Sequence, residues 1–371
     1  MRVGVPKEIK VQEHRVGLTP MAVREYVAAG HEVLVQAGAG AGIGAGDAAY
    51  AAAGARIAGS AAEVFAAADM IVKVKEPQPV EWKMLRPGQI LFTYLHLAPD
   101  PEQARGLIES GCIAVAYETV TDEHGGLPLL APMSEVAGRL AIEAAAFALR
   151  KPAGGKGLLL GGVPGVPPAR VVVVGGGVVG THAARMAAGL GAEVTVIDRS
   201  LPRLRQLDEL FQGRVRTRYS SVANIEEEVL AADVVVGAVL IPGASAPKVV
   251  TRAMLARMLP RSVLVDVSID QGGCFETSHA TTHDAPTYEV DGIIHYCVAN
   301  MPGAVPATSS HALNHATLPF GLALAAHGEQ AMVHDVHLRR GLNVHRGHVP
   351  CEPVARALGL PAISPESALR M

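Results

Sequence analysis

The feature that most constrains this chain is a run of four valines leading into a glycine-rich turn, Val171 to Gly180. Consecutive β-branched residues predict a buried strand, and the residues after the turn are compatible with a helix. The glycines follow the pattern GxGxxG. Gly175 would permit the tight turn, Gly177 would let the backbone approach a pyrophosphate, and Gly180 would let the helix pack on the strand. The segment therefore predicts the phosphate-binding turn of a dinucleotide-binding βαβ unit.

The next predicted strand, Glu193–Ile197, ends at Asp198, 21 residues after Gly177. A carboxylate at this place can bind the ribose hydroxyls of an adenosine and repel a 2′-phosphate, which favours NAD as the cofactor. Arg199 leaves NADP open, because an arginine can accept a 2′-phosphate. The alternative for the whole segment is a glycine-rich turn in an ordinary βα unit.

Composition excludes several other classes of protein. The chain has 371 residues, enough for two domains or one large one, and 49% of them are hydrophobic. The formal net charge of −3 disfavours nucleic acid as a partner. No run of 18 apolar residues predicts a membrane helix. The four cysteines form no CxxC pair, so we expect neither a disulfide framework nor a zinc site, and we expect a cytoplasmic protein.

Strands and helices alternate along the chain in two series, which predicts an α/β fold with mostly parallel sheets. The first series fills residues 1–130, and the second begins with the valine strand. Two long helices, Pro132–Lys151 and Ser309–His327, are expected to join two domains. The chain would thus leave the first domain near residue 130 and return to it near residue 305. The predicted segments are 1–130, 131–305 and 306–371.

Polar side chains follow two strands of the first series. Lys73 and Lys75 come at the end of one strand, and Tyr94 and His96 at the end of another. Strand alternation predicts that the two lysines share a face. It predicts the same for Tyr94 and His96. Ligands of open α/β sheets bind outside the carboxyl ends of the strands, so these residues are candidates for a site.

Arg15, in a polar loop after the first strand, and Asp270, after the strand Val263–Val267, are further candidates. Each candidate has an ordinary structural alternative. Lys75 could be a solvated surface charge, His96 a hydrogen-bonded structural residue, and Asp270, before two glycines, a turn residue. Their convergence favours a site, because cations, a histidine and an acid all fall at strand ends in a chain with a dinucleotide turn.

Longer motifs carry a resemblance to a known family. They are MRVGVPKE at residues 1–8, EHRV at 13–16, VKVKEP at 72–77, TYLHLA at 93–98, AYETV at 116–120, PMSEVAG at 132–138, VLVDVSIDQGGCFETS at 263–278, TTH at 281–283, VANMPGAVPATSS at 298–310 and GLN at 341–343. In these motifs the chain resembles the alanine dehydrogenase family, which is related to the NAD-binding part of transhydrogenases. The resemblance runs from residue 1 to about residue 360.

The resemblance implies a fold of two Rossmann-like domains, with an NAD-binding domain inserted into a discontinuous substrate domain. It implies the reversible NAD-linked oxidative deamination of L-alanine to pyruvate and ammonium. It also implies a homo-oligomer, as many members are hexamers. Neither nucleic acid nor a membrane is expected as a partner.

The resemblance also implies roles for single residues. Arg15 and Lys75 would hold the carboxylate and carbonyl oxygen of the substrate. His96 would be the general acid/base, and Asp270 would handle the amine or the attacking water. The expected cofactor-binding residues are Ser134, Gly175, Gly177, Val178, Val179, Gly180, Asp198, Arg203, Ser220, Val239, Leu240, Val267, Ser268, Ile269, Asp270, Val298, Ala299, Asn300 and Met301. His279 stands where the family motif is expected to carry an arginine, which puts one cofactor contact in doubt.

Three rival interpretations stay open at this point. A transhydrogenase NAD-binding subunit would pass hydride to a partner protein and bind no amino acid, and an idle relative would bind NAD only. Saccharopine dehydrogenase shares the general layout but should lack the TYLHLA and NMPGAVP runs. No metal is expected, because His311 and His315 have helical spacing without the glutamate of HExxH.

Overall fold

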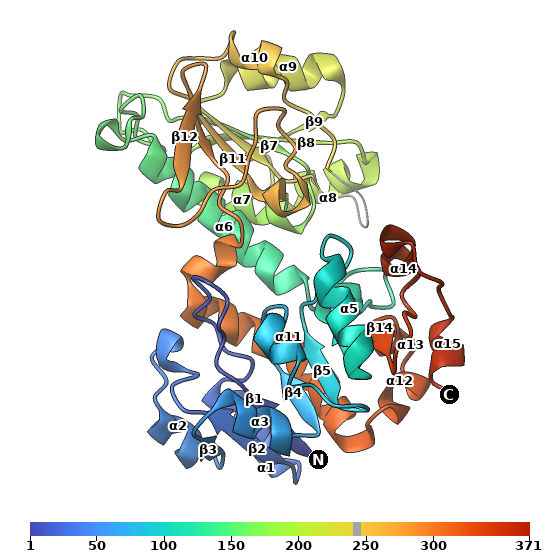
Figure 1. Ribbon diagram of the computed structural model, residues 1–371. Coiled ribbons are helices and arrows are strands. Elements are labelled where there is room, and N and C mark those ends of the chain that lie inside the picture. The colour runs from blue at the N-terminus through green and yellow to red at the C-terminus, as the bar shows by residue number, and fades with distance from the viewer. Residues whose placement is uncertain (240–245) are drawn as a thin grey trace. The chain divides into compact units, whose positions relative to one another are not determined.

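The computed structural model describes residues 1–239 and 246–371, and these residues form two compact units (Figure 1). The first unit comprises Met1–Met133 and Val305–Met371, and the second comprises Ser134–Ala304. The chain enters the second unit within helix α6 (Ala131–Ala148) and is back in the first before helix α11 (Pro306–His327). Leu240 lies outside the described residues. The two sheets confirm the predicted α/β class.

The first unit is built on a sheet with the strand order β14-β6-β5-β4-β1-β2-β3. All neighbours pair in parallel except β14, which is antiparallel to β6. Apolar side chains of α3, α4, α5 and α14 pack in one core against β4, β5 and β6. The strands are β1 (Arg2–Val5), β2 (Glu32–Gln36), β3 (Arg56–Ala58), β4 (Met70–Val72), β5 (Ile90–Thr93), β6 (Ile113–Ala116) and β14 (Leu342–His345). The helices are α1 (Pro20–Ala28), α2 (Asp47–Ala52), α3 (Ala61–Ala67), α4 (Pro79–Trp82), α5 (Pro101–Ser110), α12 (Gln330–His334), α13 (Val336–Arg339), α14 (Glu352–Leu358) and α15 (Pro365–Ala368), beside α11.

The second unit has a sheet with the strand order β12-β13-β11-β10-β7-β8-β9. Its strands are β7 (Arg170–Val174), β8 (Glu193–Asp198), β9 (Arg216–Tyr219), β10 (Val234–Gly237), β11 (Val263–Asp266), β12 (Thr287–Val290) and β13 (Ile293–Tyr296). Its helices are α7 (Val178–Gly189), α8 (Leu201–Phe211), α9 (Val222–Ala231) and α10 (Arg252–Leu255), together with most of α6.

The four valines of β7 explain why that strand is hydrophobic without alternation. Val171 and Val173 pack in a core with α6, α7 and α8. Val172 and Val174 pack in a separate core with α9 and α10. A parallel strand that is covered on both faces reads as a continuous apolar run, as here.

The hairpin of β12 and β13 was missed by the sequence analysis. These strands pair antiparallel at the end of the second sheet. Asp291 and Gly292 join them, with φ angles of 51° and 80°. Positive φ at both central residues is what a two-residue hairpin turn requires, and an Asp-Gly pair between apolar runs is its sequence signal.

The prediction that Lys73 and Lys75 share a strand face is wrong, because β4 ends at Val72. The Lys73 ammonium is fully buried, 2.9 Å from Glu8 Oε2 and 2.8 Å from Glu81 Oε1. Lys75 remains partly accessible. The amide of Val74 donates to Glu8 Oε1 at 2.7 Å, so a side chain takes the place of a strand neighbour and the alternation stops.

Candidate active site

The glycine turn after β7 has a shape that suits a phosphate group. Gly175 has φ 104°, and a Cβ there would overlap the carbonyl of Ala238. A Cβ on Gly180 would overlap the carbonyl of Gly175. A Cβ on Gly177, by contrast, would meet no described atom within 4 Å. The turn is therefore closed against the sheet and open at Gly177, at the N-terminus of α7, where a helix offers free amides to a phosphate.

Asp198, the last residue of β8, lies directly beside this turn. Its Oδ2 accepts a hydrogen bond from the Gly176 amide at 2.7 Å, and its Oδ1 accepts one from Ser200 at 2.8 Å. Arg203 donates from Nε to the Gly176 carbonyl and from Nη2 to Thr181 Oγ1, both at 2.6 Å. A fixed carboxylate next to an open glycine turn fits a dinucleotide with a free 2′-hydroxyl, which is NAD.

The other expected cofactor residues gather at the same edge of this sheet. Because β7, β8, β9, β10, β11 and β13 run parallel, the residues that follow them lie along one edge. Ser134 is on α6 instead. The expected residues that end or follow these strands are Gly175, Gly177 to Gly180, Asp198, Ser220, Val239, Val267 to Asp270, and Val298 to Met301.

A buried acid, Asp266, shapes the turn that carries Asp270. Asp266 ends β11 and is fully buried. Its carboxylate accepts hydrogen bonds from the amides of Ser268 at 3.1 Å and Cys274 at 2.8 Å, and from Ser278 Oγ at 2.5 Å. Asp270 itself is exposed, on the short helix η4 (Val267–Gln271). The sequence analysis missed Asp266, although an acid directly after the apolar run Val263–Val265 was a signal for it.

In the first unit, Lys75 and His96 meet at Glu76, a residue to which the sequence analysis gave no role. The Glu76 Oε2 atom lies 3.7 Å from Lys75 Nζ and 3.7 Å from His96 Nδ1. Lys10 pairs with the other carboxylate oxygen. Burial alone would raise the pKa of Glu76. His96, Lys75 and Lys10 together outweigh burial, so the pKa of Glu76 falls well below its ordinary value. Glu76 therefore stays ionised.

His96 combines an unusual backbone with a shifted titration. Its φ is 50°, and its imidazole stacks on the ring of Tyr94 with 5.8 Å between centroids. Desolvation and the charge of Lys75 lower the pKa of His96, whereas the carboxylates of Glu118 and Glu76 raise it. The net shift of the His96 pKa is upward. A histidine whose pKa lies above its usual value can hold a proton at neutral pH and release it to a base.

Arg15 lies in the same unit but is already engaged by a carboxylate. Its side chain is 2% exposed, and Glu13 accepts from Nε at 2.7 Å and from Nη2 at 2.6 Å. Its Nη1 lies 3.2 Å from Met133 Sδ. A hollow of about 100 Å³ is lined by Lys7, Glu8, Glu13, His14, Arg15, Gly38, Ala39, Ala41 and Gly42. The planar fork that suits a substrate carboxylate is thus oriented by Glu13.

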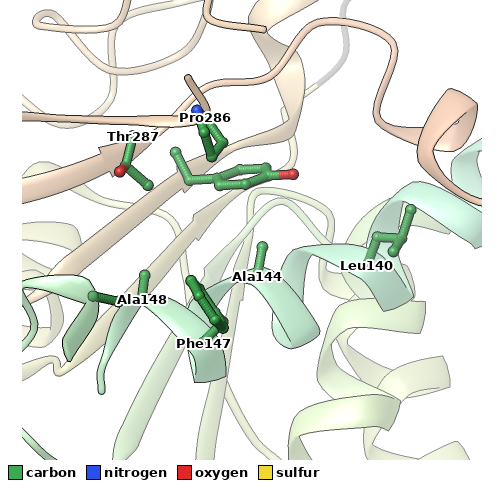
Figure 2. Close-up of a pocket in the computed structure, with 8 residues that line it drawn as sticks. Leu140, Ala144, Phe147, Ala148, Pro286 and Thr287 are labelled. Carbon is green, nitrogen blue, oxygen red and sulfur yellow. The ribbon is translucent and has the colours of Figure 1, made fainter. Parts of the chain in front are cut away.

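A larger hollow of about 310 Å³ in the second unit is apolar (Figure 2). Phe147 and Ala144 of α6 line it from one side, and Pro286 and Thr287 line it from the other. None of the expected catalytic or cofactor residues lines it.

Two further observations concern residues 1–239 and 246–371. Among them, no three His, Cys, Asp or Glu side chains come together in a group that could hold a metal ion. No helix within these ranges is both long and apolar enough to span a bilayer.

An α/β unit with this turn, and with an acid at the end of the next strand, is the cofactor unit of NAD-dependent dehydrogenases, and the chain is an enzyme of that class. Family models described as "Alanine dehydrogenase/PNT, N-terminal domain" and "Alanine dehydrogenase/PNT, C-terminal domain" match residues 4–137 and 141–352. The chain therefore belongs to the alanine dehydrogenase/PNT family, which confirms the resemblance found in the motifs.

Relatives and solved structures agree with this assignment. The chain is 57% identical over 370 residues to the alanine dehydrogenase of Halomonas elongata, and 53% identical over 370 residues to that of Mycobacterium tuberculosis, with 100% of each chain covered. A solved L-alanine dehydrogenase matches with a TM-score of 0.94 and 50% identity, covering 97% of this chain and 99% of that one. A transhydrogenase from Sinorhizobium meliloti matches with a TM-score of 0.79 and 28% identity, covering 94% and 98%.

Proposed function

We propose that this protein catalyses the reversible, NAD-dependent oxidative deamination of L-alanine to pyruvate and ammonium. The observation that carries the proposal is the cluster of Lys75, Glu76 and His96 after β4 and β5, in a chain that also has the open glycine turn. A lysine, held at the carboxyl ends of parallel strands beside a histidine whose pKa is raised, suits an α-amino or α-keto acid. The similarity to alanine dehydrogenases over the whole chain supports the choice of alanine.

The proposed roles follow from the charges of these side chains. The bound cofactor would supply the acceptor for the hydride that leaves Cα of alanine. Arg15 would bind the substrate carboxylate, and Lys75 would stabilise the carbonyl oxygen that develops in pyruvate. Lys75 can do so because a compact ammonium serves as a point charge for one oxygen atom.

Two groups would move the protons of the reaction. Hydride loss from alanine gives an imine, and water must add to the imine before ammonia leaves as ammonium. His96 would take a proton in the direction of deamination and return one in the direction of amination. Asp270 would accept a proton from the amine or from the attacking water. Asp270 is exposed on η4, so its carboxylate is accessible for that task.

Other features stay predictions. The resemblance predicts a homo-oligomer, with a hexamer favoured, and a cytoplasmic location. Asp198 predicts a preference for NAD over NADP. His279, in place of the expected arginine, stacks on Tyr288 with 3.7 Å between ring centroids, so its ring is held by the second unit itself.

The proposal is tested by following NADH absorbance with purified protein, NAD and a panel of L-amino acids. Alanine should give the highest kcat/KM, and pyruvate with ammonium and NADH should give the reverse reaction. Absence of turnover with alanine in both directions would overturn the proposal. Hydride exchange between two dinucleotides without an amino acid would favour the transhydrogenase alternative.

A further inference from the structure

We propose that Glu118 is a positioning residue for His96: the Glu118 carboxylate fixes the backbone that carries the imidazole and adds a negative charge near it. Glu118 belongs to the AYETV motif, residues 116–120, which the proposed chemistry leaves without a role. The inference rests on the proposed function in one respect, which is that His96 moves protons in the reaction.

Strand register brings Glu118 to His96. β5 and β6 are parallel neighbours, and Thr93, the last residue of β5, pairs with Ala116, the last residue of β6. The chain segments that follow the two strands therefore leave the sheet side by side. One segment carries His96, and the other is the short helix η2 (Tyr117–Thr119), which carries Glu118.

The contact between the two segments runs from backbone to carboxylate. Glu118 Oε1 accepts hydrogen bonds from the amide of His96 at 2.6 Å and from the amide of Leu95 at 3.1 Å. Oε2 lies 3.3 Å from the Leu95 amide. Gln103, which is 1% exposed, donates from Nε2 to the carbonyl of Leu95 at 2.8 Å. Leu95, the residue immediately before His96, is thus held at both its amide and its carbonyl.

This clamp explains the backbone conformation of His96. A φ of 50° is in the left-handed region, which residues with a side chain adopt uncommonly and at a cost in free energy. Two successive amides that donate to one carboxylate oxygen impose it here, because charge-assisted hydrogen bonds are stronger than neutral ones. The left-handed residue ends the strand-like path of the chain and sets the direction in which the imidazole leaves the backbone.

Charge is the second part of the argument. The ionisable groups that act on His96 are Glu118, Glu76 and Lys75, and the ring of Tyr94 covers one face. Glu76 lies 3.7 Å from the ring nitrogen Nδ1, while Glu118 bonds the amide and acts on the ring through its charge. A purely structural clamp would need only an acceptor. A carboxylate adds a charge that favours the protonated ring.

Two substitutions separate the clamp from the charge. Glu118→Gln keeps an oxygen in reach of both amides but removes the charge, so kcat on the pH plateau should stay within a few-fold of the parent. The acid limb of kcat/KM for alanine should move to lower pH. Glu118→Ala removes both the acceptor oxygens and the charge. Its kcat should fall about ten- to a hundredfold at every pH, as for a misplaced catalytic group. KM for NAD should not change in either variant.

Glu123→Gln is the matched control, since Glu123 follows on the same segment and its side chain is 80% exposed. It should behave like the parent. Circular dichroism and thermal unfolding show whether each variant folds, and Glu118→Gln keeps the test decisive if Glu118→Ala does not. Parent-like kcat and an unmoved acid limb in folded Glu118→Gln and Glu118→Ala would overturn the proposal.

A measurement without turnover separates this inference from the proposed function. Protein labelled with ¹³C at histidine Cε1 is titrated by NMR, and the His96 signal is assigned by its loss in His96→Gln. The signal should titrate at lower pH in Glu118→Gln than in the parent or in Glu123→Gln. An unchanged titration contradicts the role of Glu118 even if alanine is oxidised. A lowered one supports that role even if alanine is not the substrate.

Discussion

At the scale of single residues, the first unit places one carboxylate among two lysines and a histidine. Glu76 contacts Lys10, Lys75 and His96, and its lowered pKa keeps it ionised. An anion of this kind orients the ammonium of Lys75 and the imidazole of His96 before any substrate arrives. The same charge stabilises the protonated ring, so the proton chemistry of His96 depends on its neighbours as much as on the ring itself.

His96 should set the acid limb of the pH profile. In deamination the neutral ring accepts a proton, so activity is lost as the pH falls through the raised pKa of His96. In amination the protonated ring donates, so activity is lost as the pH rises. His96→Ala should lower kcat by roughly 10²–10⁴-fold and remove this limb. Steady-state kinetics from about pH 5 to about pH 9, which brackets an ordinary or raised histidine pKa, would show this limb. A variant that keeps the parent limb contradicts the assignment.

Asp198 should set the choice of dinucleotide. A hydrogen bond to a charged group contributes roughly 1.5–3 kcal/mol, so Asp198→Ala should weaken NAD binding about ten- to a hundredfold and narrow its advantage over NADP. Because Asp198 also accepts from Gly176 and Ser200, Asp198→Asn serves as the companion variant that keeps an acceptor for the turn. The ratio of kcat/KM for NAD and NADP is the measurement, and an unchanged ratio in both variants refutes the role.

At the scale of elements, short turns after strands carry the candidate residues, and buried acids shape those turns. Asp266 holds the turn after β11, as Glu8 holds the amide of Val74 after β4. Each acid satisfies amides that no strand neighbour reaches, which a buried backbone requires. These hydrogen bonds tie down the backbone of turns that carry exposed or partly exposed side chains such as Asp270.

Replacing Asp266 should loosen the turn that carries Asp270. In the parent, several donors share the two carboxylate oxygens of Asp266, whereas Asp266→Asn offers them only one acceptor oxygen. Leaving a buried donor unpaired costs about 1–3 kcal/mol. The midpoint of urea unfolding should fall, and kcat should fall more than KM for alanine rises. Asp208→Asn, an exposed position on α8, is the control. If Asp266→Asn unfolds at the parent's urea concentration with the parent's kcat, the carboxylate is not needed.

At the scale of the whole molecule, the two units divide the candidate residues between them. Arg15, Lys75 and His96 belong to the first unit, and the glycine turn, Asp198 and Asp270 belong to the second. Each unit has its own sheet and its own cores. Substitution of Arg15 in the first unit should therefore change the binding of alanine and pyruvate and leave NAD binding intact, and substitution of Asp198 in the second unit should do the reverse.

Arg15→Lys tests this division. The variant keeps a positive charge but loses the planar fork, so KM for alanine and for pyruvate should rise about tenfold or more. Binding of the dinucleotide, measured by fluorescence titration with NADH, should match that of the parent. Asp198→Ala should show the reverse pattern. If Arg15→Lys binds pyruvate like the parent, then Arg15 and its partner Glu13 serve the fold alone.

Much of the architecture is predictable from local sequence. Thr19 and Pro20 predict the start of α1, and the Thr19 hydroxyl does accept from the Ala22 amide. Gly111 predicts the end of α5, where it adopts a φ of 66°. These signals work because capping, glycine conformations and buried strands depend on residues that are close in the chain.

What the sequence alone determined about this protein is the α/β class, the glycine turn and the family, because each depends on short contiguous patterns. Only the tertiary structure decided that Lys73 is buried while Lys75 is accessible, since Glu8 reaches Lys73 from 65 residues away. It also decided that Glu118 holds the backbone of His96, 22 residues away. The register between parallel strands creates these contacts, and no local pattern encodes which acid a strand neighbour will bring.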